Sequence, residues 1–209
     1  MREIRRIYPD IGTLVATMDK ARADGDEELR AMLNPIYERS HYHYDGWGTH
    51  APLLAAVVAT ARPGPVLEIG IGRGSSPLLI EMCRAMGRDL VGMDSEQGWI
   101  DELADLPYPE LVCMPDWNKL PAWLEAHRML TKSHWSVIFI DHGPGEARLP
   151  VTKATRGFSE FIVCHDTHNP GYLVGLDDFL DTFKFRSDYT LMPSCTSVVS
   201  DERAYPGAA

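Results

Sequence analysis

The sequence lacks the features that mark several large classes of protein. Its longest apolar run, roughly residues 51–61, is too short to cross a bilayer. Its four cysteines lie about thirty residues or more apart without a CxxC pair, which excludes zinc knuckles and thiol redox motifs. Basic residues are outnumbered, 20 against 30 acidic, and the net charge of −10 disfavours nucleic acid and anionic lipid as partners. We therefore predict a cytoplasmic protein with free thiols and neither a nucleic-acid nor a membrane partner.

The composition is otherwise that of an ordinary globular protein, with 44% hydrophobic and 24% charged residues among 209. A chain of this length forms one large domain or two small ones, and a single domain buries more of its surface. We therefore expect one domain.

From residue 65 onward, β-rich runs alternate with helix-like segments, a pattern that requires crossover connections and so predicts a parallel sheet covered by helices. Strands are expected at 66–71, 90–94, 110–114, 135–141 and 161–164, and helices at 76–86, 97–103, 120–130, 149–156 and 172–183. Runs at 189–192 and 196–200 are joined by too short a link for a crossover, so they should pair antiparallel at the end of the sheet. Upstream, helical spacing is found at 11–23, 27–37 and 52–61.

A glycine-rich turn with the sequence EIGIGRGSSP, residues 68–77, follows the first of these strands. Glycines between a strand and a helix allow a ligand to approach bare backbone at a helix N-terminus, with Ser75 or Ser76 as the cap and Pro77 in the first turn. The dinucleotide pattern GxGxxG fails, because its third glycine would fall at Ser75 or Pro77, and no Gly-Lys-Ser/Thr of a P-loop follows.

The turn does match the ExGxGxG pattern of the class I S-adenosylmethionine-dependent methyltransferases, and residues 49–200 resemble this family. The resemblance implies an α/β Rossmann-like fold with a mostly parallel seven-stranded sheet, an antiparallel C-terminal hairpin and helices on both faces. It also implies that the loop wraps the methionine part of the cofactor, that an acid after the second strand binds the ribose, and that the segment after the third strand holds the adenine. The matching residues are Glu68, Gly70, Gly72, Gly74, Asp94, Asp116 and Trp117.

The resemblance further implies one methyltransferase domain over residues 1–209, with a cofactor-binding core at 51–203 and an N-terminal cap at 1–50 that folds over the active site. In the cap, Tyr42, Tyr44 and Trp47 are expected to form an aromatic wall around substrate and sulfonium. The histidines at 41, 43 and 50 match no standard zinc spacing.

Polar residues follow the fourth and fifth predicted strands, where ligands bind in open parallel sheets. Asp141 and His142 follow the fourth, and His165 and Asp166 the fifth, so both groups should face the reacting methyl group. His142 has a second expected role as a lining of the cofactor pocket. Arg148 either binds a substrate carboxylate or pairs with nearby Glu146.

Two mechanisms remain open for this centre. In the first, Asp141 and Asp166 hold Mg²⁺ or another divalent cation, as the resemblance to the catechol O-methyltransferase group implies, and Asn169 or His168 substitutes for its third ligand. The chain departs from that group at two positions. Thr167 stands where the group has Asn, and Pro144 stands where it has a lysine near the Asp-His pair. In the second, no metal is present and His142 or His165 removes a proton while an Asp orients the ring. Transfer by alignment alone, without a base, is a further alternative.

The expected reaction is therefore methyl transfer from S-adenosylmethionine to an oxygen, or less readily a nitrogen, of a small molecule. Two alternatives of other classes remain at this point: a nucleotide-cofactor oxidoreductase, and a binding module that keeps the cofactor pocket without chemistry. The sequence is also compatible with a homodimer.

Overall fold

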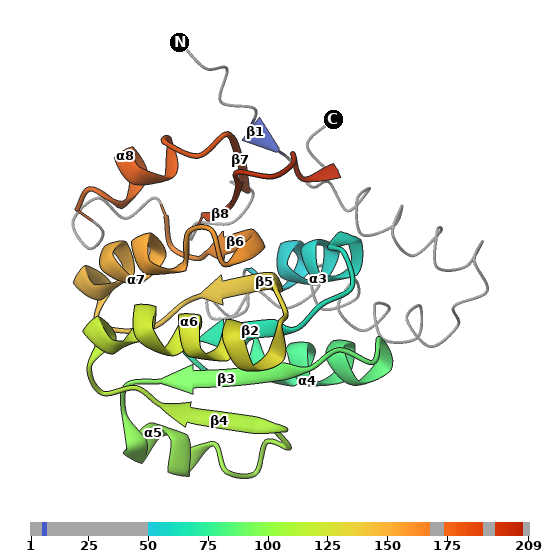
Figure 1. Ribbon diagram of the computed structural model, residues 1–209, viewed down its shortest axis with the longest axis vertical. Coiled ribbons are helices and arrows are strands. Elements are labelled where there is room, and N and C mark those ends of the chain that lie inside the picture. Colours follow the sequence, from blue (N-terminus) through green and yellow to red (C-terminus); the bar gives the residue numbers. More distant parts are fainter. Residues whose placement is uncertain (1–5, 8–49, 168–173, 190–194, 207–209) are drawn as a thin grey trace.

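The computed structural model describes residues 6–7, 50–167, 174–189 and 195–206. Its strands form one sheet in the order β1-β7-β8-β6-β5-β2-β3-β4 (Figure 1). The chain forms β1 (Arg6–Ile7), β2 (Val66–Ile69), β3 (Leu90–Asp94), β4 (Glu110–Cys113), β5 (Trp135–Ile140), β6 (Ser159–Cys164), β7 (Phe185–Tyr189) and β8 (Thr196–Ser200). The helices are α3 (Ala51–Thr60), α4 (Ser76–Ala85), α5 (Gln97–Glu102), α6 (Leu120–Thr131), α7 (Arg148–Thr155) and α8 (Leu176–Leu180), with short 3₁₀ turns η1 (Trp117–Lys119) and η2 (Gly145–Ala147).

The predicted fold is confirmed. Strands β2 to β6 run parallel to one another, and β8 runs antiparallel between β6 and β7. The predicted strands at 90–94 and 196–200 have the observed bounds, and most other ends differ by one or two residues. The two-residue β1, which pairs with β7, was not predicted.

The last part of the chain differs more from the prediction. Of the strand expected at 189–192, residues 190–192 lie outside the described residues. The described strand β7 covers residues 185–189, and the prediction missed its first part because Arg186 and Asp188 interrupt the apolar pattern. These charges pair inside the sheet: Arg186 Nε donates to Asp188 Oδ1 at 2.9 Å, and Ser197 Oγ donates to the same oxygen at 2.6 Å. The helix expected at 172–183 is reduced to α8, which begins after Gly175, where φ is +76°. Residues 168–173 and the predicted helices at 11–23 and 27–37 lie outside the described residues.

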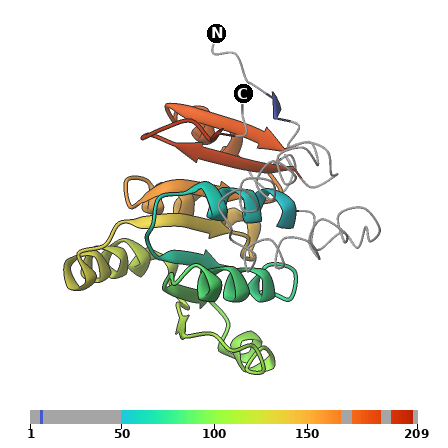
Figure 2. The ribbon, with the colours of Figure 1, turned by 90° about the vertical axis from the view of Figure 1, so that its right-hand side faces the viewer.

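Helices cover both faces of the sheet (Figures 1 and 2). On one face α3 and α4 pack against alternate residues of the central strands, including Val66, Val137 and Phe139. On the other face α6, α7 and α8 pack against the residues between them, including Leu67 and Ile138. The central strands are apolar on both sides for this reason. Each of the four cysteines lies in the described part of the chain, and none forms a disulfide bond there.

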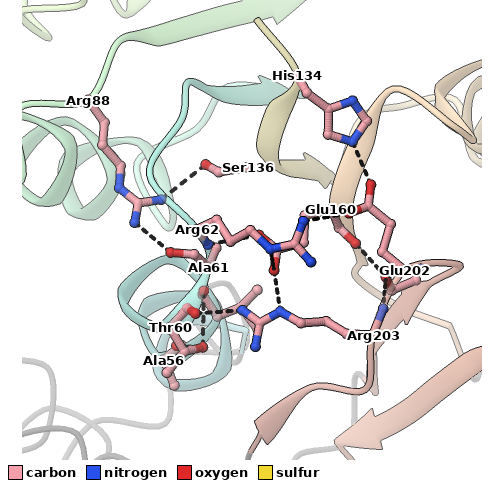
Figure 3. A network of polar contacts seen from close by, with 12 residues as sticks. Ala56, Thr60, Ala61, Arg62, Arg88, His134, Ser136, Glu160, Glu202 and Arg203 are labelled. Carbon is pink, nitrogen blue, oxygen red and sulfur yellow. Dashed lines mark hydrogen bonds and ion pairs between the residues drawn. The ribbon is translucent and has the colours of Figure 1, made fainter.

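A polar network closes the edge of the sheet where the parallel strands begin (Figure 3). The buried carboxylate of Glu160, at the start of β6, accepts the Arg62 backbone N–H at 2.7 Å and contacts the guanidinium of Arg203. Arg203 also donates to the Thr60 carbonyl at 2.7 Å. These bonds fix the end of α3 and the segment after β8 to the sheet, and they leave the opposite edge for a functional site. Among the described residues, none of the helices combines the length and apolarity needed to span a membrane.

Candidate functional site at the carboxyl edge of the sheet

The candidate site is built where the parallel strands end, and backbone bonds between neighbouring strands continue into it. Gly70 N–H donates to the Met93 carbonyl at 2.8 Å, and Asp141 N–H donates to the Ile69 carbonyl at 2.8 Å. The His165 N–H continues the series by donating to the Ile140 carbonyl at 3.1 Å. The ends of β3, β2, β5 and β6 are therefore side by side, as the sequence predicted for the polar residues that follow them.

Gly70 lies where the glycine-rich loop after β2 comes closest to the end of β5. Its φ is +95°, a conformation that residues with a Cβ rarely adopt. A Cβ built on Gly70 would lie 2.5 Å from the backbone of Asp141 and His142. Gly70 is thus required by the fold itself. Gly72 differs, because a Cβ there would meet no atom of the described residues within 4 Å.

Glu68 holds the glycine-rich loop from beneath. Its carboxylate is fully buried and accepts hydrogen bonds from the hydroxyls of Ser75, Ser76 and Tyr108. Ser76 Oγ in turn accepts the Gly72 N–H at 2.8 Å. Burial raises the pKa of Glu68 from its ordinary 4.5 to about 7. Glu68, predicted to bind cofactor, is therefore engaged with the protein and shapes the loop.

The start of α4 also departs from the prediction in one detail. Ser75 stands at the N-cap position, as expected, with proline in the first turn, but no side-chain hydrogen bond caps the helix. The Ser75 hydroxyl is directed to Glu68 instead. The backbone N–H groups of Ser75 and Ser76 both donate to the Gly72 carbonyl, at 3.3 and 2.9 Å, so the start of α4 is bonded to the loop itself.

Asp94 ends β3 beside the same loop, in the position predicted for it. It is 9% exposed, and burial raises its pKa. Its Oδ1 accepts the Glu96 N–H at 3.1 Å. Trp99, on α5, donates from Nε1 to the Ile71 carbonyl at 2.7 Å and is 40% exposed. Sequence analysis missed Trp99, whose only signal was an aromatic residue five positions after the acid.

Asp116, Trp117 and His142 lie on the β4 side of the site. Asp116 Oδ1 accepts the Asn118 backbone N–H at 3.1 Å, so it begins the turn η1. The ring of Trp117 contacts that of His142, with centroids 4.5 Å apart. His142 is buried, and burial lowers its pKa to about 4. Asp116 is thus a cap in the structure, and its contact with adenine stays a prediction.

On the β6 side, Asp141 contacts two buried imidazoles. Its Oδ1 lies 3.2 Å from His165 Nδ1, and its Oδ2 lies 3.8 Å from His50 Nδ1. Burial alone would raise the pKa of Asp141, but the contact with His165 and the charges of His50 and Arg148 hold it below its ordinary value. Burial lowers the pKa of His50 to about 4. Sequence analysis named Asp141 and His165 but assigned no site role to His50.

Arg148 joins the ends of β5 and β6 from within. Its guanidinium donates to the carbonyls of His142 and His165, both at 2.8 Å, and to Asp141 Oδ1 at 2.9 Å. A further N–H group lies 3.3 Å from Asp166 Oδ2. The structure therefore places this buried arginine among internal acceptors, where it positions both strand ends, in contrast to the substrate contact and the Glu146 pair expected from the sequence.

Thr167 is buried against β8, where its hydroxyl lies 2.8 Å from Ser197 Oγ. The cap residues Tyr42, Tyr44 and Trp47, and the metal candidate Asn169, lie outside the described residues.

No protein-family model matches the sequence, and no curated protein does. Solved structures do match. NSun6 from Pyrococcus horikoshii with SFG is 12% identical, over 75% of this chain and 53% of that chain, with a TM-score of 0.47. TrmK from M. capricolum with S-adenosyl-homocysteine is 9% identical, over 73% and 69% of the two chains, with a TM-score of 0.44. A mutant of MtNAS with S-adenosylmethionine is 10% identical, over 91% and 72%, with a TM-score of 0.47.

The chain spans about half the length of the NSun6 chain. Its sheet is mostly parallel with an antiparallel strand inserted next to the last parallel one, which is the arrangement predicted from the sequence. The chain thus has a Rossmann-like α/β fold.

Proposed function

We propose that the protein transfers a methyl group from S-adenosylmethionine to an oxygen atom of a small molecule. One observation carries the proposal: the open loop at Gly72 lies between the buried acid Asp94 on one side and the Asp141–His165 pair on the other. This arrangement offers a nucleoside site and a proton acceptor along one edge of the sheet, on the strands that flank β2.

Three features of this edge fit the cofactor. Among the described residues, no atom lies within 4 Å of a Cβ built on Gly72, so the loop leaves space for a ligand on that side. Asp94 retains acceptor capacity for ribose hydroxyls after accepting the Glu96 N–H, because a carboxylate has about four lone-pair sites. The Trp117–His142 pair provides an aromatic and apolar border for the adenine. When bound, the cofactor supplies an electrophilic methyl group on a sulfonium.

The acceptor oxygen would be deprotonated at the ends of β5 and β6. His165 would take the hydroxyl proton as the oxygen attacks the methyl carbon, so that the C–O bond would form while the C–S bond would break with its electron pair on sulfur. Asp141, 3.2 Å from Nδ1, orients the ring and stabilises its charged form. Arg148 fixes the carboxylate and the His165 carbonyl together. Holding the reactants in line contributes the rest of the acceleration.

An oxygen acceptor is favoured because a hydroxyl must lose its proton to become a good nucleophile, and this centre contains a proton acceptor. A small acceptor is favoured because the net charge of −10 opposes binding of polyanionic RNA or DNA.

The magnesium site expected from the catechol O-methyltransferase resemblance does not fit. The guanidinium of Arg148 already lies between the two carboxylates, 2.9 Å from Asp141 Oδ1 and 3.3 Å from Asp166 Oδ2. A bound Mg²⁺ would have to share both oxygens with a fixed positive charge. We therefore route no step through magnesium.

The proposal is tested by incubating the purified protein with a small-molecule extract and methyl-labelled S-adenosylmethionine, followed by mass spectrometry. We expect a labelled product whose formation falls by on the order of 100-fold or more in His165→Gln. The exposed His134, at the opposite edge of the sheet, provides the matched control His134→Gln, which should leave turnover unchanged. Label that enters no product while S-adenosylhomocysteine binds would show a module without chemistry.

A further inference from the structure

Three side chains with metal-binding atoms converge from separate parts of the chain. His50 precedes α3, Asp141 follows β5 and His165 follows β6, and one ligating atom from each lies within 4.8 Å of the other two. Within the described residues this is the one such group. The sequence spacing gave no sign of it, because the sheet order brings the three segments together.

His50 provides a second and independent observation. Its side chain is 1% exposed, and among the described residues neither ring nitrogen has a hydrogen-bond partner. Buried polar atoms are nearly always paired, so an orphaned imidazole calls for a partner. The ring is held in place by edge contacts with Phe139 and His165, with centroids 4.8 and 4.6 Å away. Its Nδ1 faces Asp141 Oδ2 at 3.8 Å, which is too long for a direct hydrogen bond.

We infer that His50, Asp141 and His165 form a binding site for a divalent transition-metal ion of the two-histidine, one-carboxylate type. Bonds to zinc of roughly 2.0–2.2 Å place two ligands of one ion about 3–4 Å apart. The distances from the Asp141 carboxylate are of this size: 3.2 Å from Oδ1 to His165 Nδ1 and 3.8 Å from Oδ2 to His50 Nδ1. The three ligand atoms lie within 4.8 Å of one another, so a ring displacement of about 1 Å would bring them to the separation that one ion requires.

The chemistry of the donor set selects the kind of ion. Imidazole suits zinc, iron, nickel and cobalt, whereas magnesium and calcium prefer an all-oxygen environment. Arg148 holds Oδ1 of Asp141 and thereby leaves Oδ2 on the side of His50. The two negative charges of Asp141 and Asp166 outnumber the single positive charge of Arg148 by one, and this excess of negative charge favours binding of a cation. Three protein ligands would leave coordination positions open for an acceptor oxygen.

This inference deepens the proposed function and rests on it only for the role of the ion. An ion at this position would lower the pKa of a bound hydroxyl, and His165 would then act as its ligand while the proton passes to solvent. Binding of the ion itself is measured without cofactor or acceptor, so the two ideas fail separately.

The test uses the full chain without a histidine tag, stripped with chelator and titrated with Co²⁺, which has visible absorption when bound by nitrogen and oxygen ligands. We expect saturation at one Co²⁺ per chain, competition by Zn²⁺ and none by Mg²⁺. His50→Gln and His165→Gln should each weaken binding by on the order of 100-fold, since even loss of a supporting partner costs roughly 10- to 100-fold. The control His134→Gln should bind as the wild-type protein does.

Circular dichroism of each variant separates loss of a ligand from loss of the fold. If one histidine variant does not fold, the other, together with Asp141→Asn, still decides. The inference is overturned if the stripped wild-type protein takes up no Co²⁺. It is equally overturned if folded His50→Gln and His165→Gln bind Co²⁺ as tightly as the wild-type protein, because the ion would then be held elsewhere.

Discussion

Replacing either of two glycines in the first loop by alanine should have opposite consequences for stability and for cofactor binding. Gly70 has a φ of +95° and no room for a Cβ, which would lie 2.5 Å from the backbone of Asp141 and His142. Gly72 has no atom of the described residues within 4 Å of its Cβ position. The same methyl group is therefore added to a filled site and to an open one.

For Gly70→Ala we expect a loss of about 3 kcal/mol in the free energy of unfolding. The left-handed backbone contributes roughly 1–2 kcal/mol and the forced separation from the β5 end roughly 1–3 kcal/mol. For a chain of this size the melting temperature should fall by roughly 10 °C. Gly72→Ala should change the free energy of unfolding by less than about 1 kcal/mol, because a less flexible loop offsets small local costs.

Calorimetric titration with S-adenosylhomocysteine then separates the two roles. If the cofactor occupies the space beside Gly72, the added methyl group costs about 1–3 kcal/mol of binding free energy, or roughly 5- to 150-fold in affinity. Denaturant unfolding of both variants provides the stability measurement. A stable Gly72→Ala that binds the ligand as the wild-type protein does would refute the placement of the cofactor, and an unperturbed Gly70→Ala would refute the packing argument.

Three further changes test the buried polar groups. Glu68→Gln should remove a pH dependence: because the folded pKa of about 7 exceeds the ordinary 4.5, the stabilisation by this group is complete below pH 4.5 and about 3 kcal/mol is lost as the pH rises to 7. Denaturant unfolding of both proteins across that range checks it, and equal slopes would contradict it. Arg148→Met should cost about 3–5 kcal/mol by leaving two partly buried carboxylates and two backbone carbonyls without their partner, and a change below about 1 kcal/mol in the same assay would disprove the clamp. Glu160→Gln, at the opposite edge (Figure 3), should cost roughly 2 kcal/mol without altering S-adenosylhomocysteine affinity, and weaker binding would show coupling that the structure does not provide.

Much of the fold was predictable because its signals are local. Apolar runs such as 135–141 and 90–94 are typical of strands covered on both faces, and β5 and β3 are found there. The glycine-rich turn and Asp94 lie at neighbouring strand ends because parallel strands all finish at one edge. The same rule brought Asp141 and His165 together.

The remaining features depend on contacts between distant segments. No spacing indicates that His50 enters the centre formed by Asp141, because this follows from the packing of α3 beneath β5. The basic side chain of Arg148 suggested an exposed substrate contact, whereas four internal acceptors compensate for its burial. Glu68 resembled a cofactor ligand in the sequence, and its partner Tyr108 lies forty positions away.

The central claim is that a sulfonium nucleoside binds the loop after β2 with its ribose at Asp94. Isothermal titration of the wild-type protein with S-adenosylhomocysteine tests this most directly, with Asp94→Ala as the matched variant and NADH as the comparison ligand. The account predicts binding of one molecule per chain, an affinity at least about 10-fold weaker in Asp94→Ala, and no heat from NADH. Heat from NADH alone, or equal affinity in a folded Asp94→Ala, would contradict it.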